Sequence, residues 1–495
     1  MSAEPTMSSR HDNGSALVAD VPTGLFIDGK WRPASDGETF EVIDPATGKP
    51  LTSVASAAVD DGRDAAAAAA AAQPEWAATA PRERAEILRR AFELMTDRKD
   101  QLAELMVLEN GKALKDAVAE VVYAAEFFRW YAEEAVRLIG SIQEAPAGTN
   151  KIVVIHQPVG VALLITPWNF PAAMATRKIG PAFAAGCTVI LKPASDTPLT
   201  ALALASLLTE AGAPQGTINV LPSRRSGPLV SALLADSPVS KLSFTGSTEV
   251  GRGLLAQASE RILNASMELG GNAPFLVLDD ADMDDAVAGA MIAKMRNGGE
   301  ACTAANRFYV QSPVAEEFSR RLAEAMANLR VGPGLDPGTD LGPLVNQAGK
   351  DKVAELVQGA LDSGARVLSG AHAIDRPGYF YEPTVLGYVP PDAPILDTEI
   401  FGPVAPVVAF DSDADAIALA NDTESGLVSY LYTGDYRRGL GIAEALEAGM
   451  VGLNRPIGSD PAAPFGGVKR SGIGREGGHD GMLEFTETKY IAVEW

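Results

Sequence analysis

Cysteine and histidine are scarce in this sequence. Its 495 residues include two cysteines, Cys187 and Cys302, and four histidines scattered at His11, His156, His372 and His479. Two cysteines without paired spacing exclude a disulfide framework, and no His/Cys cluster has the spacing of a zinc site. We therefore expect neither a structural disulfide nor a metal site, and we expect the reducing environment of the cytoplasm.

Basic charge and long apolar runs are also lacking. Lys and Arg number 41 against 64 Asp and Glu, a formal net charge of −23. Such acidity argues against nucleic acid or an anionic membrane as a partner. No run reaches the ~18 apolar residues of a membrane helix, and residues 1–23 lack the apolar core of a signal peptide. We expect a small-molecule partner, with no nucleic acid and no membrane.

The remaining composition, 46% hydrophobic and 21% charged, is that of an ordinary globular protein. Residues 1–23 are polar and are predicted to be a disordered tail. Asp28-Gly29, between apolar residues, predicts a hairpin in a small opening sheet. The alanine run 65–72 predicts a helix that ends near Pro74.

Short β-branched runs alternate with helical patterns after Gly148 and again from about Gly270. This alternation predicts an α/β fold with two doubly wound parallel sheets. The predicted strands are 159–166, 188–191, 217–221, 241–244, 274–278, 307–310, 404–410, 428–432 and 450–453. A final exposed strand, 488–493, could pair with another subunit.

Three peptides stand where ligands bind such sheets, at the carboxyl ends of strands. They are 167–171 (PWNFP), 192–195 (KPAS) and 245–248 (TGST). The usual dinucleotide fingerprint is missing, because Gly246 and Gly251 are spaced G-x-x-x-x-G without a following Lys. Helix N-termini after residues 192 and 244 could still hold a phosphate, and simple turns are the alternative.

Cys302 and Glu268 lie in glycine-rich turns 34 residues apart. A thiolate is a good nucleophile and a carboxylate can act as general base, so the pair could run two-stage acyl chemistry. Cys187, within an apolar run, fits a buried structural cysteine instead. On local context alone, Cys302 could be either.

Seven peptides occur in this order: 167–171, 191–195, 244–248, 267–271 (MELGG), 299–302 (GEAC), 399–403 (EIFGP) and 464–467 (PFGG). On these peptides, residues 25–495 resemble the NAD(P)-dependent aldehyde dehydrogenase superfamily and, within it, the bacterial succinate-semialdehyde dehydrogenases. It implies two doubly wound domains plus a small oligomerisation sheet. The cofactor-binding domain would comprise 24–147 and 157–269, the catalytic domain 270–478, and the oligomerisation segments 148–156 and 479–495, in a homodimer or homotetramer.

The resemblance also implies catalytic roles. Cys302 would attack the aldehyde as thiolate, Asn169 and the Cys302 backbone N–H would hold the oxyanion, and Glu268 would activate the water that hydrolyses the thioester. Ala304 replaces a second cysteine that some relatives carry, so a local redox disulfide is not available.

For the cofactor, the resemblance places Trp168 and Lys192 beside the adenosine ribose, Gly246 and Ser247 near the pyrophosphate, and Glu399 and Phe401 at the nicotinamide ribose. The same surface would include Thr166, Pro167, Ala194 and Leu269. Many NAD-preferring relatives have Glu where this chain has Ser195, and that carboxylate would repel a 2′-phosphate. Ser195, with Lys192 and Arg224 or Arg225 nearby, favours NADP, while NAD stays possible.

Arg177, Arg296 and Ser459 stand where succinate-semialdehyde dehydrogenases bind the substrate carboxylate, which suits arginine's paired donors. The expected reaction is oxidation of succinate semialdehyde or a similar carboxylated aldehyde. The loop with Arg455-Pro456 and Gly458 departs from the pattern and could reshape the pocket mouth. A glutarate-semialdehyde dehydrogenase, a dehydrogenase for a less polar aldehyde, a cofactor-independent cysteine esterase and a non-catalytic relative are the alternatives.

Overall fold

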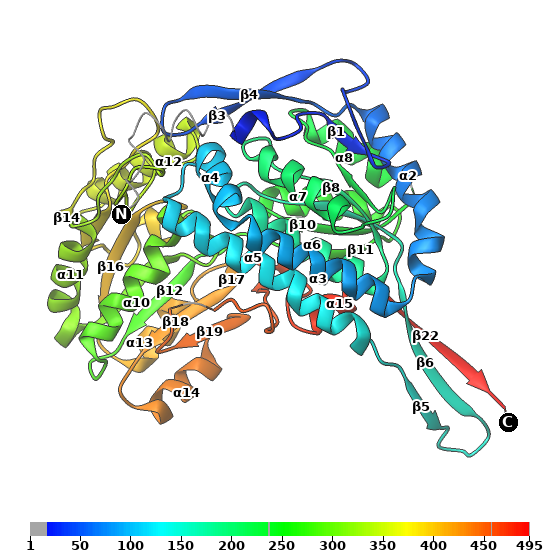
Figure 1. Cartoon of the computed structure of the whole chain (residues 1–495). Helices are drawn as coiled ribbons and strands as arrows, with labels where there is room; N and C mark the ends of the chain where they lie inside the picture. The colour runs from blue at the N-terminus through cyan, green and yellow to red at the C-terminus, as the bar shows by residue number, and fades with distance from the viewer. Residues whose placement is uncertain (1–16, 236–237, 457, 495) are drawn as a thin grey trace, which may run out of the picture.

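The computed structural model describes residues 17–235, 238–456 and 458–494. Figure 1 shows two α/β units side by side and an arm that projects from one of them. The first unit is built on an eight-stranded sheet in the order β2-β1-β9-β8-β7-β10-β11-β21. In that order the strands are Lys30–Arg32, Leu25–Ile27, Ile218–Val220, Thr188–Lys192, Val161–Ile165, Val239–Thr245, Asn264–Glu268 and Gly472–Ile473.

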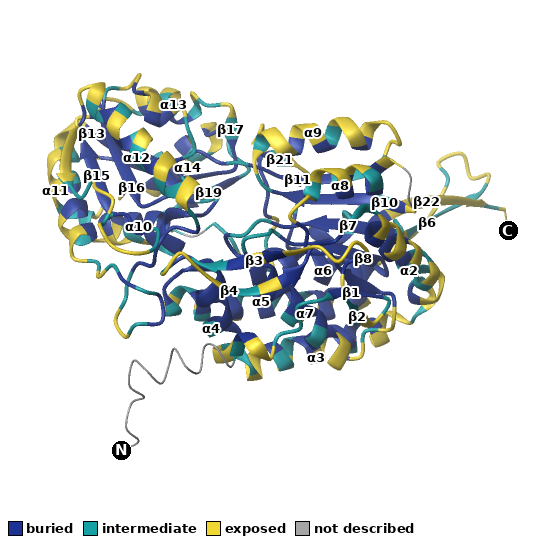
Figure 2. Ribbon diagram, turned by 90° about the horizontal axis from the view of Figure 1, so that it is seen from above, coloured by how far each residue is buried: buried dark blue, intermediate teal, exposed yellow. Residues whose placement is uncertain are grey.

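The five inner strands, β9 to β11 in this order, run parallel, while β1, β2 and β21 pair antiparallel at the edges. Residues alternate between two buried faces along a strand. Leu164 of β7 packs into one hydrophobic cluster, whereas Leu163 packs into the other. A sheet buried on both faces needs helices on both sides, and Figure 2 shows its strands as mostly buried between helices.

One face of the first sheet is covered by α2 (Val59–Ala78), α8 (Ser226–Ala235) and α9 (Thr248–Ser259). The other face is covered by α3 (Pro81–Asp97), α4 (Lys99–Asn110), α5 (Leu114–Glu134), α6 (Pro171–Ala185) and α7 (Pro198–Glu210).

The second unit has a seven-stranded sheet in the order β14-β15-β16-β13-β12-β18-β19. It is parallel except for β14, and its strands in that order are Arg366–Ser369, Thr384–Gly387, Val404–Phe410, Ala305–Gln311, Ala273–Val277, Val428–Tyr432 and Met450–Leu453. Helices α10 (Met283–Met295) and α11 (Ser312–Ala327) cover one face, and α12 (Gln347–Asp362), α13 (Asp413–Asn421) and α14 (Tyr436–Ala445) the other. The predicted fold of two doubly wound sheets is confirmed.

The arm is a three-stranded antiparallel sheet in the order β22-β6-β5, made of Thr486–Val493, Lys151–Pro158 and Ser141–Glu144. The terminal strand pairs with β6 of its own chain from Thr486↔Pro158 to Val493↔Lys151. Its outer edge has no partner strand among the described residues. Residues 141–144, which the prediction placed in the cofactor-binding domain, belong to this arm because they pair with β6.

The structure departs from the predicted domain division at two further places. Strand β21, from the predicted catalytic domain, pairs with β11 of the first sheet. Part of the predicted disordered tail is packed, since Val18 is 5% exposed within the first unit's core. The tail prediction for residues 1–16 lies outside the described residues.

Two local predictions from the N-terminal region had different outcomes. The hairpin is confirmed, with Asp28 and Gly29 at φ 54° and 72° between β1 and β2. The predicted helix end near Pro74 is wrong, because α2 continues to Ala78. The Gln73 side chain donates to the Gly186 carbonyl and Trp76 is buried, so contacts with the core hold the helix past the proline.

The remaining elements are short. They are β3 (Thr39–Asp44) with β4 (Lys49–Ala55), β17 (Ser425–Gly426) with β20 (Val468–Lys469), the 3₁₀ turns η1 (Ala135–Arg137), η2 (Arg296–Gly299) and η3 (Pro394–Leu396), and α15 (Asp480–Leu483). Among the described helices, none has both the length and the apolar content that crossing a bilayer requires.

Candidate active site

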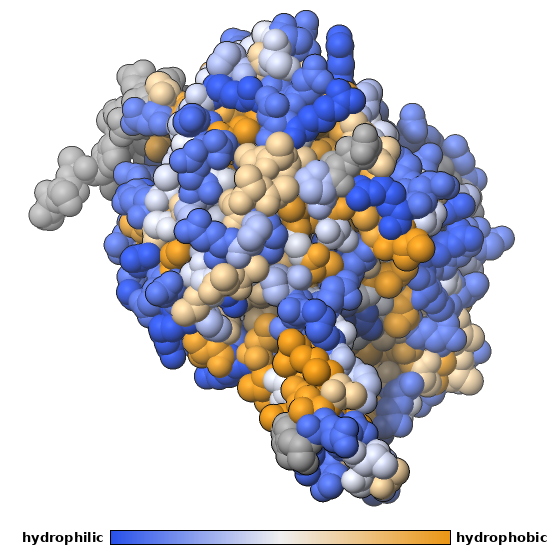
Figure 3. Space-filling view, turned by 90° about the vertical axis from the view of Figure 1, so that its right-hand side faces the viewer, coloured by the Kyte–Doolittle hydropathy of each residue, from blue (hydrophilic) through white to orange (hydrophobic). Residues whose placement is uncertain are grey.

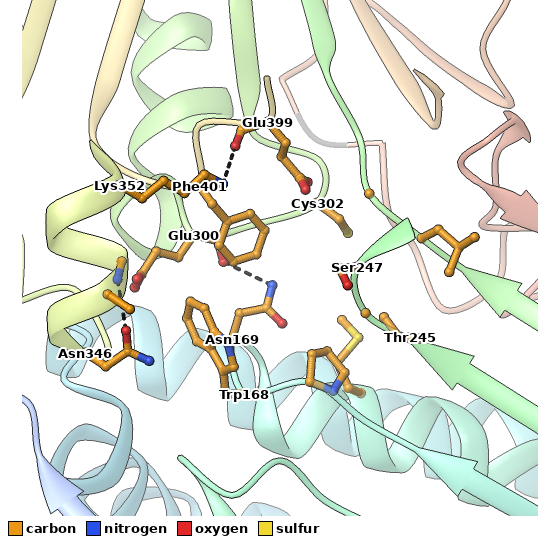
Figure 4. A pocket seen from close by; sticks show the side chains of 17 residues that line it. Trp168, Asn169, Thr245, Ser247, Glu300, Cys302, Asn346, Lys352, Glu399 and Phe401 are labelled. Atoms are coloured by element: carbon orange, nitrogen blue, oxygen red, sulfur yellow. Dashed lines mark hydrogen bonds between the residues drawn. The ribbon is translucent and has the colours of Figure 1, made fainter. Parts of the chain in front are cut away.

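A cleft of about 380 Å³ collects residues from both units. In the first unit they follow the carboxyl ends of strands, whereas Cys302 and Glu399 of the second unit precede β13 and β16. Figure 4 shows Asn169, Cys302, Glu399 and Phe401 around it. The predicted site residues that line it are Pro167, Trp168, Asn169, Gly246, Ser247, Leu269, Cys302, Glu399 and Phe401. Peptides that are far apart in the sequence therefore meet at one place.

The loop before Cys302 has an unusual backbone. Asn297, Gly298 and Gly299 have φ values of 52°, 64° and 78° in succession. A Cβ on Gly299 would lie 2.3 Å from the Gly402 carbonyl oxygen, so only glycine fits there. The loop turns Cys302 into the cleft. Burial raises the pKa of the Cys302 thiol to about 12, against the opposing effect of Arg177 and with smaller contributions from Glu399 and Glu268.

Asn169 lies beside Cys302 with its amide fixed. Its Nδ2 donates to the Glu300 carbonyl at 3.0 Å, drawn as a dashed line in Figure 4. The Asn297 side chain donates to the Asn169 carbonyl at 2.9 Å and to the Glu300 carbonyl at 3.0 Å. An amide nitrogen carries two hydrogens. The second is available to an oxygen bound in the cleft, as an oxyanion site requires.

Glu268, at the end of β11, is buried and does not line the cleft. Its Oε2 has no hydrogen-bond partner among the described residues. Burial, followed by the negative charge of Glu476, raises the pKa of Glu268 well above its usual value, against Arg177 and Lys178. A carboxyl group that is held neutral in this way must lose its own proton before it can act as a base.

A buried ionic cluster lies next to Glu268. The Nε of Arg177 is 2.5 Å from Oε2 of Glu476, and Lys178 donates to the other carboxylate oxygen of Glu476. Burial opposes ionisation, but Arg177 and Lys178 together keep the pKa of Glu476 below its usual value. Glu476 and Lys178 were not predicted, because they are 298 positions apart and neither one's local sequence indicates the other.

A second cleft of about 520 Å³ continues the first, because both share Pro167, Trp168, Thr245, Gly246 and Ser247. It is lined by the predicted residues Thr166, Lys192, Ala194 and Ser195. Burial lowers the pKa of Lys192 to about 8, with Asp196 opposing. Nη1 of Arg224 lies 3.5 Å from Oγ of Ser195.

The two clefts together form one groove. Its far end, the second cleft, has the features that a dinucleotide requires. Ser247 caps the twelve-residue helix α9 and accepts from the Val250 N–H, so the N-terminus of that helix faces the groove. Lys192, Ser195 and Arg224 sit where a ribose phosphate could be held. These residues fit a nicotinamide dinucleotide.

At the other side of the groove, Glu399 accepts from the Gly271 N–H at 3.0 Å, and burial raises the pKa of Glu399 to about 7. The ring of Phe401 meets that of Trp168 edge-on at 5.3 Å between centroids. Lining residues outside every peptide singled out from the sequence are Met174, Asn346, Ala348, Gly349 and Lys352, while Thr245, Gly270 and Glu300 belong to such peptides.

Asn346 shows why some of these were missed. It caps α12, and its Nδ2 donates to Oδ1 of Asp196 at 3.1 Å, which links the two units across the groove. No predicted strand ends at Asn346 and none of the seven resemblance peptides contains it, so it was not predicted. An Asn before a helical pattern was the available signal.

A third, small cavity adjoins the nucleophile, since Ala301 and Thr303 line it on either side of Cys302. Arg296 and Ser459, two of the predicted substrate-binding residues, also line it. The guanidinium of Arg296 lies 4.9 Å from the Phe170 ring centroid. Arg177 does not line this cavity, and its Nε is paired with Glu476. The loop with Arg455 borders the cavity through Pro456 and Gly458, and Ile457 lies outside the described residues.

Comparison with known proteins agrees with this geometry. Residues 31–491 match the model of the aldehyde dehydrogenase family. A succinate-semialdehyde dehydrogenase from Paenarthrobacter nicotinovorans is 56% identical over 90% of this chain and 98% of its own length. A glutarate-semialdehyde dehydrogenase from Pseudomonas putida is 48% identical over 94% of this chain and 97% of its own length.

Among solved structures, an NADP-dependent enzyme from E. coli is 48% identical, with a TM-score of 0.95 over 97% of this chain and 99% of that one. The family match covers far more than half of the sequence, and these relatives align along almost their whole length. The chain belongs to the aldehyde dehydrogenase family.

Proposed function

We propose that this protein oxidises succinate semialdehyde to succinate with NADP. The observation that carries the proposal is the position of Arg296. Its guanidinium lines the cavity beside Cys302, and no ion pair ties it to a carboxylate among the described residues. A half-buried arginine without a carboxylate partner is suited to a substrate that brings its own carboxylate.

The reaction would begin with Cys302. Once the thiol proton has passed to solvent, the sulfur adds as thiolate to the aldehyde carbon, and the carbonyl oxygen becomes an oxyanion that the Asn169 amide holds. Removing one such donor typically costs about 2.7 to 4 kcal/mol of barrier. When bound, the nicotinamide supplies the hydride acceptor, and the sulfur is left in a thioester with the substrate carbon.

Glu268 would act in the second half of the reaction. It takes a proton from water, the water oxygen attacks the thioester carbon, and the acid is released as Cys302 regains its thiol. The raised pKa of Glu268, caused by burial and Glu476, makes it a stronger base than an exposed glutamate once it is ionised.

NADP is favoured over NAD by the residues near Ser195. Serine carries no charge to repel a 2′-phosphate, and Arg224 within 3.5 Å supplies a cation. The E. coli structure described as NADP-dependent supports the same choice. NAD remains a usable second cofactor, because the rest of the groove contacts parts that both dinucleotides share.

Glutarate semialdehyde is the second candidate, and the Pseudomonas putida relative favours it. It differs by one methylene, which a pocket typically discriminates by about 10–200-fold. The test is kcat/KM for succinate semialdehyde, glutarate semialdehyde and butanal, each with NADP and with NAD. Highest kcat/KM for succinate semialdehyde with NADP supports the proposal; equal values for butanal would refute a carboxylate site.

The arm supports a homodimer or homotetramer. Strand β22 offers an unpaired edge, and Ile139, Ile142, Tyr490 and Ile491 are exposed around it. Figure 3 shows hydrophobic side chains gathered along the projecting arm. A second copy of the chain would cover both features. We also propose the first unit as the cofactor-binding domain and the second as the catalytic domain, in a cytoplasm that keeps Cys302 reduced.

A further inference from the structure

A segment far from the cleft in sequence holds the turn that carries Asn169. Asn110 donates from Nδ2 to the Trp168 carbonyl at 3.0 Å. Lys112 donates from Nζ to the next carbonyl, that of Asn169, at 2.7 Å. Two consecutive peptide groups of the turn are therefore fixed by side chains from the end of α4 and the residue two positions beyond it.

Lys112 is buried with a buried counter-ion. Its side chain is 1% exposed, and its Nζ lies 2.6 Å from Oε2 of Glu120. Oε1 of Glu120 accepts from the N–H groups of Ala172 and Ala173 at 2.9 and 3.2 Å. These groups open α6, directly after the turn. The ion pair thus holds the turn on one side and the helix that follows it on the other.

The backbone at Gly111 directs Lys112 to this position. Gly111 ends α4 with φ 90°, in the left-handed region, and a Cβ there would lie 2.9 Å from Cγ of Pro343. The chain turns sharply, and the Leu114 N–H then donates to the Gly334 carbonyl of the second unit at 3.0 Å. Lys112 therefore sits where the two units meet, behind the cleft.

We propose that Lys112 is a positioning residue that sets the Asn169 amide relative to Cys302. The inference rests on the proposed function, in which Asn169 holds the oxyanion. The Asn169 carbonyl accepts hydrogen bonds from Lys112 and Asn297, while the Asn169 side-chain amide donates to the Glu300 carbonyl. Loss of the Lys112 contact frees the peptide group attached to the Asn169 Cα, so the amide no longer meets the developing charge in a fixed place.

The test is a double-mutant cycle between Lys112 and Asn169. Removing Lys112 alone would leave Glu120 buried without a partner, so Lys112→Met is always combined with Glu120→Gln, whose oxygen still accepts from Ala172 and Ala173. This pair is compared with the intact pair, with and without Asn169→Ala, and is meant wherever Lys112→Met is named below. Lys115→Met is the matched control, because Lys115 is an exposed lysine nearby, paired with Asp340 at the surface.

With Asn169 present, Lys112→Met is expected to lower kcat by about 10–100-fold, since small misplacements of a catalytic group cost this much. KM for the aldehyde and Kd for NADP should change by less than about threefold, and in the Asn169→Ala background the loss should shrink to less than about threefold. Equal losses in both backgrounds, or no loss in either, would overturn the proposal. Lys115→Met should leave kcat unchanged.

A separate readout keeps this result distinct from the substrate assignment. Hydrolysis of p-nitrophenyl acetate requires the thiolate and the oxyanion donor but neither NADP nor a carboxylated aldehyde. If the wild type fails to oxidise succinate semialdehyde, the proposed function fails. The same cycle on ester hydrolysis then still decides whether Lys112 acts through Asn169.

Discussion

The Nε of Arg177 lies 2.5 Å from Oε2 of Glu476, and both side chains are buried. Arg177 is therefore largely committed to a carboxylate of its own chain. Arg296, by contrast, lies against the rings of Phe170 and Tyr123 and faces the cavity beside Cys302. Of the two predicted carboxylate-binding arginines, Arg296 is the one free to select the substrate.

Replacement of Arg296 tests this difference. Arg296→Leu should lower kcat/KM for succinate semialdehyde by about 10–150-fold, because a charge-assisted pair to a carboxylate contributes about 1.5–3 kcal/mol. Steady-state kinetics with butanal provide the control, since butanal has the same chain length without the carboxylate. A loss of the same size with butanal would show that Arg296 supports the fold rather than selectivity.

Cofactor preference should change at Ser195. Ser195→Glu should lower kcat/KM for NADP by about 10–100-fold and leave that for NAD within about threefold, because a carboxylate repels the 2′-phosphate. Arg224→Ala should weaken NADP alone, by a smaller factor. Parallel titrations of both dinucleotides measure the ratio. An unchanged ratio in both variants would contradict the assignment of Ser195 and Arg224 to the phosphate.

The pH dependence of the free energy of unfolding should reveal the protonation of Glu300. Burial raises the pKa of Glu300 to about 8, with the Val345 N–H opposing, whereas an unfolded Glu titrates near 4.3. Between these values the folded chain holds a proton that the unfolded chain has lost, so stability falls as pH rises, by up to about 1.4 kcal/mol per unit.

Glu300→Gln removes this cost while keeping an oxygen for the Val345 N–H. The variant should exceed the wild type in denaturant midpoint at about pH 8 and lose that advantage near about pH 4.5. Glu316→Gln, at an exposed position of α11, is the matched control. An advantage of equal size at both pH values would argue against titration of Glu300.

Assembly through the arm can be tested with a charge on its apolar surface. Ile142→Glu combined with Ile491→Glu should lower the mass in solution, because both side chains are exposed in the single chain and would be buried by a second copy. Analytical ultracentrifugation measures the mass. An unchanged oligomer would place the interface elsewhere, and a wild-type monomer would refute the assembly.

Much of the fold could be predicted because the periodicity was strong. Strands β16, β18 and β19 have the predicted limits, since β-branched runs between turns leave few alternatives. The helix end predicted near Pro74 was wrong because the proline's cost to the helix is outweighed by the tertiary contacts of Gln73 and Trp76. No sequence pattern displays those contacts.

The site was predictable where a motif follows a strand, as at Trp168 and Ser195, and where a reactive group lies in a glycine-rich turn, as at Cys302. The pairing of Arg177 with Glu476 was not, because the two residues are 299 positions apart and neither stands in a peptide that suggests the other. Lys112 was missed for the same reason. From sequence alone, a lysine is expected to be a surface charge. Its burial becomes evident only when the carbonyl and carboxylate that surround it are known.

A single turnover of Glu268→Gln tests the central chemistry most directly. The variant should reduce about one NADP per active site in a rapid burst with succinate semialdehyde and then stall, because the thioester on Cys302 lacks its base. Stopped-flow absorbance measures the burst, and intact-protein mass should show one acyl group that disappears in Cys302→Ser. Steady turnover without a burst or an acyl adduct would contradict the roles of Cys302 and Glu268.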